Sequence, residues 1–292
     1  MKLLKNLSKD AMKKITKKQS EKLSAELWKY YDKHGRRNLA WRKKHTPYAV
    51  VVSEIMLQQT QVVRVEEYFK DWMGKYPTWR SLAQSPLREV LISWQGLGYN
   101  RRGKYLHDIA QVVTEKYKGK LPSDRLELQG LPGIGHYTAG SIRAFAFNEL
   151  DIFMETNIRT VLFYHLYDYK NTILKSVDDK ELLGVLEKYL AHDSRAKENP
   201  REFYWALMDY GSYLKQTIGN LNTRARAHTR QSRFEGSRRQ LRAQLLRFIL
   251  ENERTEKEII AQGTKSVELT KELLTDLVKE GSVKKKGKKY FV

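Results

Sequence analysis

Apolar residues recur at intervals of three and four along most of this chain, which is the pattern of amphipathic helices. The segment that ends at Gly35 and the one that begins at Pro47 show this spacing clearly. Further helices are predicted near residues 80–85, 86–94, 101–118, 156–168, 178–192 and 200–215. The segment 217–236 is polar and aperiodic, so we predict a linker or an ordered loop there. The pattern therefore predicts a mainly α fold.

The pattern changes from Ser237 onward. Three short amphipathic helices are followed by SVKKKGKKYFV, which predicts two short strands that turn at Gly287. Three helices and a basic hairpin are typical of a winged helix, whose third helix would address the major groove and whose hairpin would contact phosphates. Such domains also serve in contacts between proteins. We expect a helical core over 1–216, a linker or loop over 217–236 and a winged-helix-like domain over 237–292.

The charge of the chain favours a polyanionic partner. Lys and Arg number 55 against 34 Asp and Glu, so the formal net charge is +21. The positive charge is concentrated in residues 1–20, 222–247 and 279–289. Because arginine forks suit phosphate oxygens and lysines neutralise a nucleic-acid backbone, nucleic acid is the expected partner. A lysine-rich surface that serves solubility alone is the alternative.

The residue types that are missing exclude several classes of protein. The chain has no cysteine, which excludes disulfides, zinc fingers, thiolate-held iron–sulfur clusters and a cysteine nucleophile. No run approaches eighteen apolar residues, so no transmembrane helix is predicted. The basic first twenty residues lack the apolar segment of a secretory signal. We expect a soluble, monomeric protein that is cytoplasmic and associated with the nucleoid.

A glycine-rich hairpin is the strongest local motif. The run LPGIG, which contains Leu131, Gly133 and Gly135, lies between two predicted helices. We expect Ser123 to be the N-cap of the first of these helices. Glycines let the backbone approach a ligand, and the next helix offers N–H groups at the positive end of its dipole. Phosphate is the natural ligand, although many helix–helix turns use glycine without binding anything.

With its surroundings, the hairpin resembles that of the helix-hairpin-helix (HhH-GPD) DNA glycosylases, which include endonuclease III and the MutY-type adenine glycosylases. The matching segments, in the family's order over about residues 25–235, are TPYAVVVSEIMLQQTQVVRVEEYF, WQGLGYNRRGKYLH, LPGIGHYTAGSIRAFAF, ETNIRTVL and ALMDYG. SEIMLQQTQ and GLGY are closer to the adenine glycosylase branch than to endonuclease III. The resemblance implies a two-lobed core, with a six-helix lobe over about 51–160 and a second lobe from 20–50 plus 161–216.

The resemblance assigns catalytic roles to four residues. Glu54 lies in the apolar run VVVSEIML, where desolvation favours the protonated carboxyl, and it matches the acid that protonates the purine leaving group. Glu155 stands where the family has an aspartate that stabilises the positive sugar, and Asn157 matches an asparagine near the sugar. Tyr137 occupies the position of the Schiff-base lysine of bifunctional members, which implies a reaction without efficient strand cleavage. The alternatives are a paired carboxyl at Glu54, helix caps at 155 and 157 and a core aromatic at 137.

A second set of residues matches the family's contacts with DNA. Gln58, Gln59 and Thr60 match the segment that enters the duplex near the flipped base, and Leu97 and Tyr99 match the residues that wedge beside the estranged base. A helix end and a turn aromatic are the structural alternatives.

The chain also departs from the family. Asn100 replaces an aromatic residue that is common in the adenine branch. The four cysteines that bind a [4Fe–4S] cluster in most members correspond to Lys215, Asn222, Ala225 and Gln231, so no ligand for the cluster is present. We expect neither a cofactor nor a metal site, except that a monovalent cation could bind at the hairpin.

Two replacements follow from these departures. We expect Arg224, Arg226 and Arg230 to hold DNA phosphates in place of the cluster loop. The winged-helix-like domain stands where adenine glycosylases carry a domain that recognises 8-oxoguanine, so recognition of that base is not assured.

The resemblance implies a monofunctional DNA glycosylase that acts on double-stranded DNA with a mismatched or damaged base. It would flip the base and remove it by hydrolysis, and adenine opposite guanine or 8-oxoguanine is the expected substrate. Two alternatives stay open: a glycosylase for thymine or uracil opposite guanine, and a non-catalytic, structure-specific DNA-binding protein. The presence of Glu54, Tyr137 and Asn157 speaks against the second.

Overall fold

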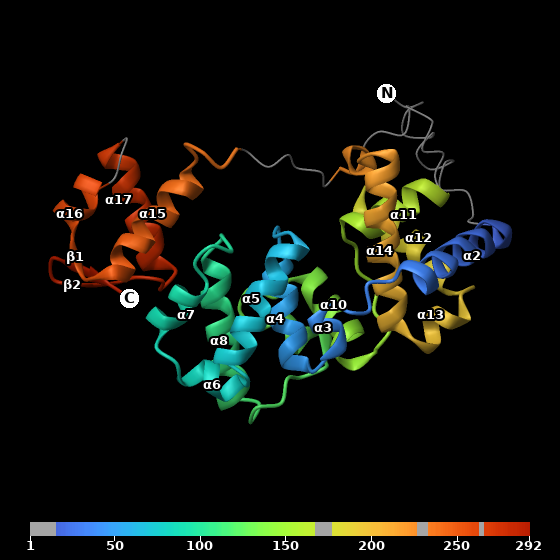
Figure 1. Ribbon diagram of the computed structural model, residues 1–292, viewed down its shortest axis with the longest axis horizontal. Coiled ribbons are helices and arrows are strands. Elements are labelled where there is room, and N and C mark those ends of the chain that lie inside the picture. The colour runs from blue at the N-terminus through green and yellow to red at the C-terminus, as the bar shows by residue number, and fades with distance from the viewer. Residues whose placement is uncertain (1–15, 167–176, 227–232, 263–265) are drawn as a thin grey trace. The chain divides into compact units, whose positions relative to one another are not determined.

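The computed structural model describes residues 16–166, 177–226, 233–262 and 266–292 (Figure 1). Helices dominate these residues, and a small three-stranded sheet lies near the C-terminus. No helix among the described residues has the length and apolar character needed to cross a membrane. The chain divides into two compact units: unit 1 is Met1–Lys43 with Gly135–Arg230, and unit 2 is Lys44–Ile134 with Gln231–Val292. The predicted mainly α fold is confirmed.

Unit 1 is built around the long helix α14. Its helices are α2 (Lys17–His34), α3 (Ala40–Lys43), α10 (His136–Phe147), α11 (Thr156–Leu166), α12 (Asp179–Leu190), α13 (Ser194–Glu198), α14 (Pro200–Ile218) and the 3-10 helix η1 (Leu221–Arg224). Helices α2, α10 and α11 pack against α14. Asp209 of α14 is buried and accepts hydrogen bonds from the Arg42 guanidinium at 2.7 and 2.9 Å. Burial favours a raised pKa for Asp209, but Arg42 and Arg36 outweigh it and hold the pKa below its usual value.

Unit 2 has a helical part and a C-terminal domain. The helical part contains α4 (Pro47–Leu57), α5 (Val62–Lys75), α6 (Trp79–Gln84), α7 (Leu87–Ser93), α8 (Arg101–Glu115) and α9 (Arg125–Gln129). Helix α8 packs against α4, α6 and α7. The C-terminal domain contains α15 (Arg238–Glu251), β1 (Arg254–Thr255), α16 (Glu256–Gln262), α17 (Val267–Lys279), β2 (Lys284–Lys286) and β3 (Lys289–Phe291).

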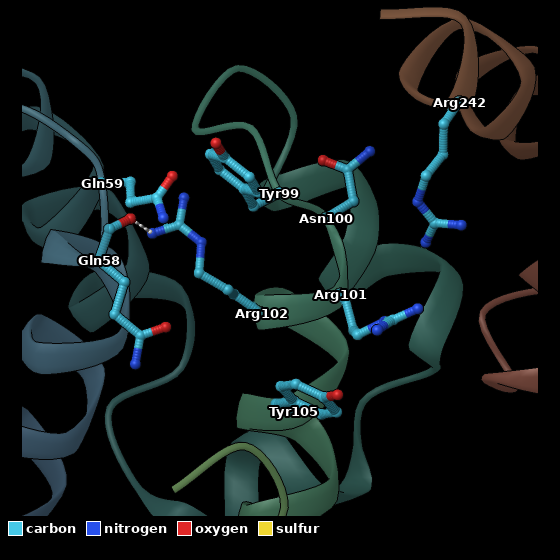
Figure 2. A pocket seen from close by; sticks show the side chains of 8 residues that line it. All are labelled: Gln58, Gln59, Tyr99, Asn100, Arg101, Arg102, Tyr105 and Arg242. Atoms are coloured by element: carbon cyan, nitrogen blue, oxygen red, sulfur yellow. Dashed lines mark hydrogen bonds between the residues drawn. The ribbon is translucent and has the colours of Figure 1, made fainter. Parts of the chain in front are cut away.

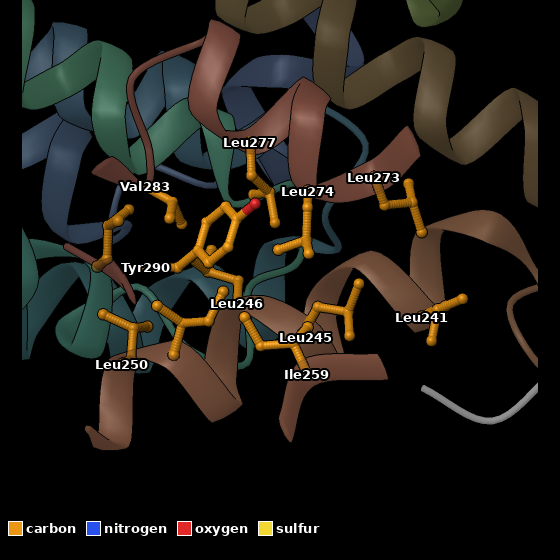
Figure 3. Packing of buried hydrophobic residues seen from close by; sticks show 12 residues of the cluster. Leu241, Leu245, Leu246, Leu250, Ile259, Leu273, Leu274, Leu277, Val283 and Tyr290 are labelled. Atoms are coloured by element: carbon orange, nitrogen blue, oxygen red, sulfur yellow. The ribbon is translucent and has the colours of Figure 1, made fainter. Parts of the chain in front are cut away.

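The C-terminal domain has the predicted winged-helix architecture. Strands β2 and β3 form an antiparallel hairpin around Gly287, and β1 pairs with β3 to give the order β1-β3-β2. The sequence did not reveal β1, because two residues carry no alternating pattern. The hydrophobic core joins α15, α16, α17 and Tyr290 of β3, and Leu91 of α7 belongs to the same cluster (Figure 3). The domain therefore shares its core with the helical part of unit 2.

The two units differ from the expected lobes in where they divide the chain. The six-helix lobe was expected to run to about residue 160, whereas the structure groups α10 and α11 with α14 in unit 1. The reason lies in aromatic packing around Phe153. Its ring stacks on Tyr204 of α14 with centroids 4.0 Å apart, and it lies so close to Gly140 of α10 that a Cβ there would be 2.9 Å away. These contacts tie α10 to α14.

Candidate functional site

Glu54 lies on α4, a helix that is buried along most of its length. Thr46 caps the helix by accepting from the N–H of Ala49, and Pro47 occupies its first position. The residues on both sides of Glu54 are buried, and Glu54 itself is only 7% exposed. A carboxyl removed from water in this way is costly unless it is paired or used, which is the condition expected of a general acid.

Arg102 connects the end of this helix with the turn before α8. Its guanidinium is buried and donates hydrogen bonds of 2.5–3.0 Å to six oxygens: the carbonyls of Ile55, Met56, Gln58, Leu97 and Gly98 and the hydroxyl of Thr60. Burial lowers the pKa of Arg102 to about 10. One side chain thus fixes the two segments that the resemblance assigns to the flipped base and its partner.

Both fixed segments contain a residue with left-handed backbone geometry. Gln59 has φ 56° and Tyr99 has φ 48°, which side chains rarely adopt outside glycine and asparagine. Strain of this kind is kept only where the surroundings impose it, and it clusters at functional sites. Gln59 and Tyr99 are exposed, whereas Leu97 is buried, so Leu97 is not presented to a duplex in this structure.

A pocket of about 270 Å³ lies between these segments and the C-terminal domain (Figure 2). Gln58 and Gln59 line one side, Tyr99 and Tyr105 lie along it, and Arg242 of α15 reaches in from the other side. The remaining lining residues are Asn100, Arg101 and Arg102. The structure thus brings Gln58, Gln59 and Tyr99 together in one pocket of unit 2.

The hairpin has the geometry that its glycines predict. Gly133 has φ 72°, and a Cβ there would lie 2.3 Å from the Tyr105 ring, so another residue would be both strained and too close. Leu131 is buried, and Gly135 is the N-cap of α10. The preceding helix α9 is capped by Asp124, which accepts from two backbone N–H groups, so the prediction of Ser123 as its cap was wrong.

Glu155 and Asn157 lie at the start of α11 in unit 1. The Glu155 carboxylate accepts a hydrogen bond of 2.8 Å from the N–H of Asn157, so it caps the helix. Burial of the carboxyl raises the pKa of Glu155, although the N–H of Asn157 opposes that shift. The backbone of Asn157 packs tightly on Gly211 of α14, where a Cβ would lie 2.2 Å from its carbonyl oxygen. Tyr137 is half-buried and meets the Phe153 ring edge-on at 5.6 Å.

The Arg-rich segment after α14 is partly described. Arg224 ends η1, and Arg226 lies 3.8 Å from Asp178 with its side chain 73% exposed; Arg230 lies outside the described residues. The chain has no thiolate for an iron–sulfur cluster. Among the described residues, no group of three or more His, Asp or Glu side chains could hold a metal. The residues present therefore do not fit the cluster that most family members carry.

These features define a helix-hairpin-helix protein with a buried carboxyl and a strained, arginine-fixed loop pair. The model of the HhH-GPD superfamily of base excision DNA repair proteins matches residues 52–208, which is more than half of the chain. The chain belongs to this superfamily.

The chain is also similar to proteins named adenine DNA glycosylase. It is 33% identical over 186 residues to that of Buchnera aphidicola subsp. Baizongia pistaciae, covering 63% of this chain and 50% of the relative. It is 43% identical over 145 residues to that of Rattus norvegicus, covering 47% and 28%. The chain thus spans about half the length of the Buchnera relative and less of the rat one. The resemblance to the adenine glycosylase branch is confirmed.

Solved structures show the same fold. A thermostable thymine-DNA glycosylase matches with a TM-score of 0.56 at 24% identity, covering 67% of this chain and 87% of that one. An endonuclease III–DNA complex matches with a TM-score of 0.55 at 22% identity, covering 68% and 87%.

Sequence reasoning missed Arg102 and Arg242. Arg102 is one of two adjacent arginines in GLGYNRRGKY, and nothing in that run distinguishes the buried one from the exposed one. Arg242 lies more than a hundred residues from the loops it approaches, so only the docking of α15 reveals it.

Proposed function

We propose that this protein is a monofunctional DNA glycosylase that removes adenine mispaired with guanine or 8-oxoguanine. The observation that carries the proposal is the buried Glu54 on α4, next to the Gln58–Thr60 segment that Arg102 holds. Membership of the superfamily and the similarity to adenine DNA glycosylases support the choice of reaction and base. The thymine-DNA glycosylase likeness is a likeness of fold, so it gives thymine no comparable support.

In the proposed reaction, Glu54 transfers its proton to N7 of the flipped adenine. The C1′–N9 bond breaks, its electron pair leaves with the protonated base, and positive charge develops on the sugar. Water attacks C1′, and Glu155 stabilises the charge and accepts the proton that the water loses. Burial raises the pKa of Glu155, which makes its carboxylate a stronger proton acceptor. The products are free adenine and an abasic site.

Tyr137 supports the monofunctional part of the proposal. An amine at this position would attack C1′ and form an imine that permits strand cleavage, but a phenol cannot form an imine. Strand breaks are therefore expected only when the abasic site is cleaved chemically.

A panel of labelled duplexes tests the proposal. Purified protein is incubated with A·G, A·8-oxoguanine, T·G and U·G duplexes, and each sample is analysed with and without hot alkali. Release from the two adenine duplexes, with breaks only after alkali, is the expected result. Release from T·G and U·G alone would contradict the choice of base, and no release from any duplex would favour a binding-only protein. Breaks without alkali would contradict the monofunctional assignment.

A further inference from the structure

The ring of Tyr99 is held by two arginines that come from different parts of unit 2. Arg102 of α8 binds the carbonyls of Leu97 and Gly98, and its guanidinium carbon lies 5.5 Å from the centre of the ring. Arg239 of α15 donates a hydrogen bond of 2.6 Å to the Tyr99 hydroxyl, and its guanidinium carbon lies 5.4 Å from the same centre. The helical part thus fixes the backbone before the ring, and the C-terminal domain holds its hydroxyl end.

Arg239 can reach the ring because the C-terminal domain is docked on α7 and α8. Glu280, the C-cap residue of α17, has a side chain that is only 8% exposed. It pairs with Arg101 of α8 at 2.5 Å and with Arg242 of α15. Leu91 of α7 belongs to the hydrophobic core of the domain. A buried carboxylate that loses its partners is costly, so these pairs favour one position of the domain and of Arg239.

The held ring is still accessible. Tyr99 is 38% exposed, although its backbone has the strained φ of 48°. An exposed aromatic ring beside guanidinium groups suits stacking against a base. Ordering a side chain during binding costs conformational entropy, and a contact that restricts the ring in the free protein reduces this cost. The contact with Arg239 therefore prepares Tyr99 for insertion beside a base.

We propose that Arg239 is a positioning residue for Tyr99 and that the docked C-terminal domain thereby takes part in opening the duplex beside the excised base. The inference rests on the proposed function and deepens it. The appended domain becomes part of the base-flipping step, whereas an independent DNA-binding module would not act on Tyr99.

The test measures how far the duplex is opened, which does not require base release. The full chain is added at saturating concentration to a duplex in which an uncleavable abasic-site analogue faces guanine. A 2-aminopurine next to that guanine reports unstacking by its fluorescence. The variants are Arg239→Met, which removes the guanidinium, Tyr99→Phe, which removes the hydroxyl but keeps the ring, and the double variant. Arg238→Met is the matched control, because the adjacent Arg238 pairs with Glu272 and Asp276 of α17.

The wild type and Arg238→Met should unstack the reporter equally. Arg239→Met and Tyr99→Phe should each lower the ratio of unstacked to stacked duplex by about two- to tenfold, which is the effect of one ordinary hydrogen bond. The double variant should lose no more than either single variant, because both changes remove the same contact. No fluorescence change with the wild type, or an unchanged ratio in Arg239→Met, overturns the proposal. A higher ratio in Arg239→Met also overturns it, since the contact would then restrain the ring.

A direct contact of Arg239 with DNA would give a different pattern. The losses of the two single variants would multiply in the double variant, and Arg239→Met would show a shallower salt dependence of binding, which also overturns the proposal. If Arg239→Met does not fold, judged by its melting temperature, Tyr99→Phe decides, because it removes the same hydrogen bond from the other side.

The proposed function can fail separately. Base release from no duplex of the panel, with the shared loss of unstacking still observed, would reject the glycosylase assignment and keep the role of Arg239.

Discussion

Replacing Arg102 should loosen both loops, the one that is assigned to the flipped base and the one that is assigned to its partner. In Arg102→Met the six oxygens bound by the guanidinium lose a charged donor. Hydrogen bonds to charged groups contribute roughly 1.5–3 kcal/mol each, so a simple sum would reach the whole stability of an ordinary domain, about 5–15 kcal/mol. The contributions therefore cannot add independently.

Burial offsets part of the loss. The lowered pKa of Arg102 corresponds to a penalty of about 3 kcal/mol for holding the charge in the wild type, and the uncharged variant recovers it. The Gly98 carbonyl also keeps the 3.1 Å hydrogen bond from the Trp94 indole. We expect a net loss of about 3–5 kcal/mol, because the variant leaves buried carbonyl oxygens without a donor and each such oxygen costs about 1–3 kcal/mol.

Hydrogen–deuterium exchange of peptides that cover 55–60 and 95–100 measures this loss locally, and base release measures its consequence. Exchange should become faster in both peptides, and release should fall by about 10²-fold, because displacement of a positioning group by about 1 Å has that effect. Arg201→Met is the matched control: Arg201 also donates to helix carbonyls, those of Phe145 and Ala146, and burial lowers its pKa too. It should lose stability but keep the exchange of both loops. Wild-type exchange and release in Arg102→Met would refute this reasoning.

Four further outcomes are expected. Glu54→Gln should abolish base release while duplex binding stays nearly intact, and residual release within tenfold of the wild type would contradict the general-acid role. Glu155→Asp should keep or raise activity if the backbone tolerates the shorter side chain. Glu155→Gln should lower single-turnover base release by about 10²–10³-fold. If Glu155 only caps the helix, Glu155→Gln would instead cost about 1 kcal/mol of stability and leave base release unchanged. Exhaustive chelation should leave a colourless, fully active protein, and a visible absorbance band that tracks with activity would count against this. Burial lowers the pKa of His165 to about 4, although neighbouring Glu26 opposes the shift. The unfolded chain, with an ordinary histidine pKa near 6.5, therefore binds the proton more tightly than the folded protein. The free energy of unfolding should be at its full value above pH 6.5 and fall by about 3 kcal/mol as the pH drops to about 4. His165→Gln should flatten the melting temperature over that range, and an unchanged slope would show that other groups titrate there.

The helices were predictable because their signals are local. The helix predicted to end at Gly35 runs from Lys17 to His34, and the β-hairpin turns where the glycine placed it. The 3-10 helix η1 was not predicted, because it is held by distant partners. The Asn222 amide donates to Thr160 of α11 at 3.0 Å, and Val177 pairs with Ala225. Such contacts leave no periodic pattern in the segment itself.

The site was predictable to the extent that it resembles a known family. Motif order located Glu54, the hairpin and the Gln58–Thr60 segment, but the assigned roles stay predictions. Glu54 belongs to unit 2 and Glu155 to unit 1, so their cooperation is also still a prediction. What no motif could supply is the position of the C-terminal domain, since the family pattern ends before it.

The charges of that domain change the expectation for how it would meet DNA. The third helix of a winged helix usually enters the major groove, and the sequence expectation assigned that role to α17. However, Glu272 and Asp276 of α17 are partly exposed and pair with Arg238 of α15, so this helix presents carboxylates that phosphates would repel. The hairpin carries exposed lysines at 284–286. Because backbone affinity comes from cations near phosphates, the hairpin and α15, rather than α17, have the charge that suits contact with a duplex.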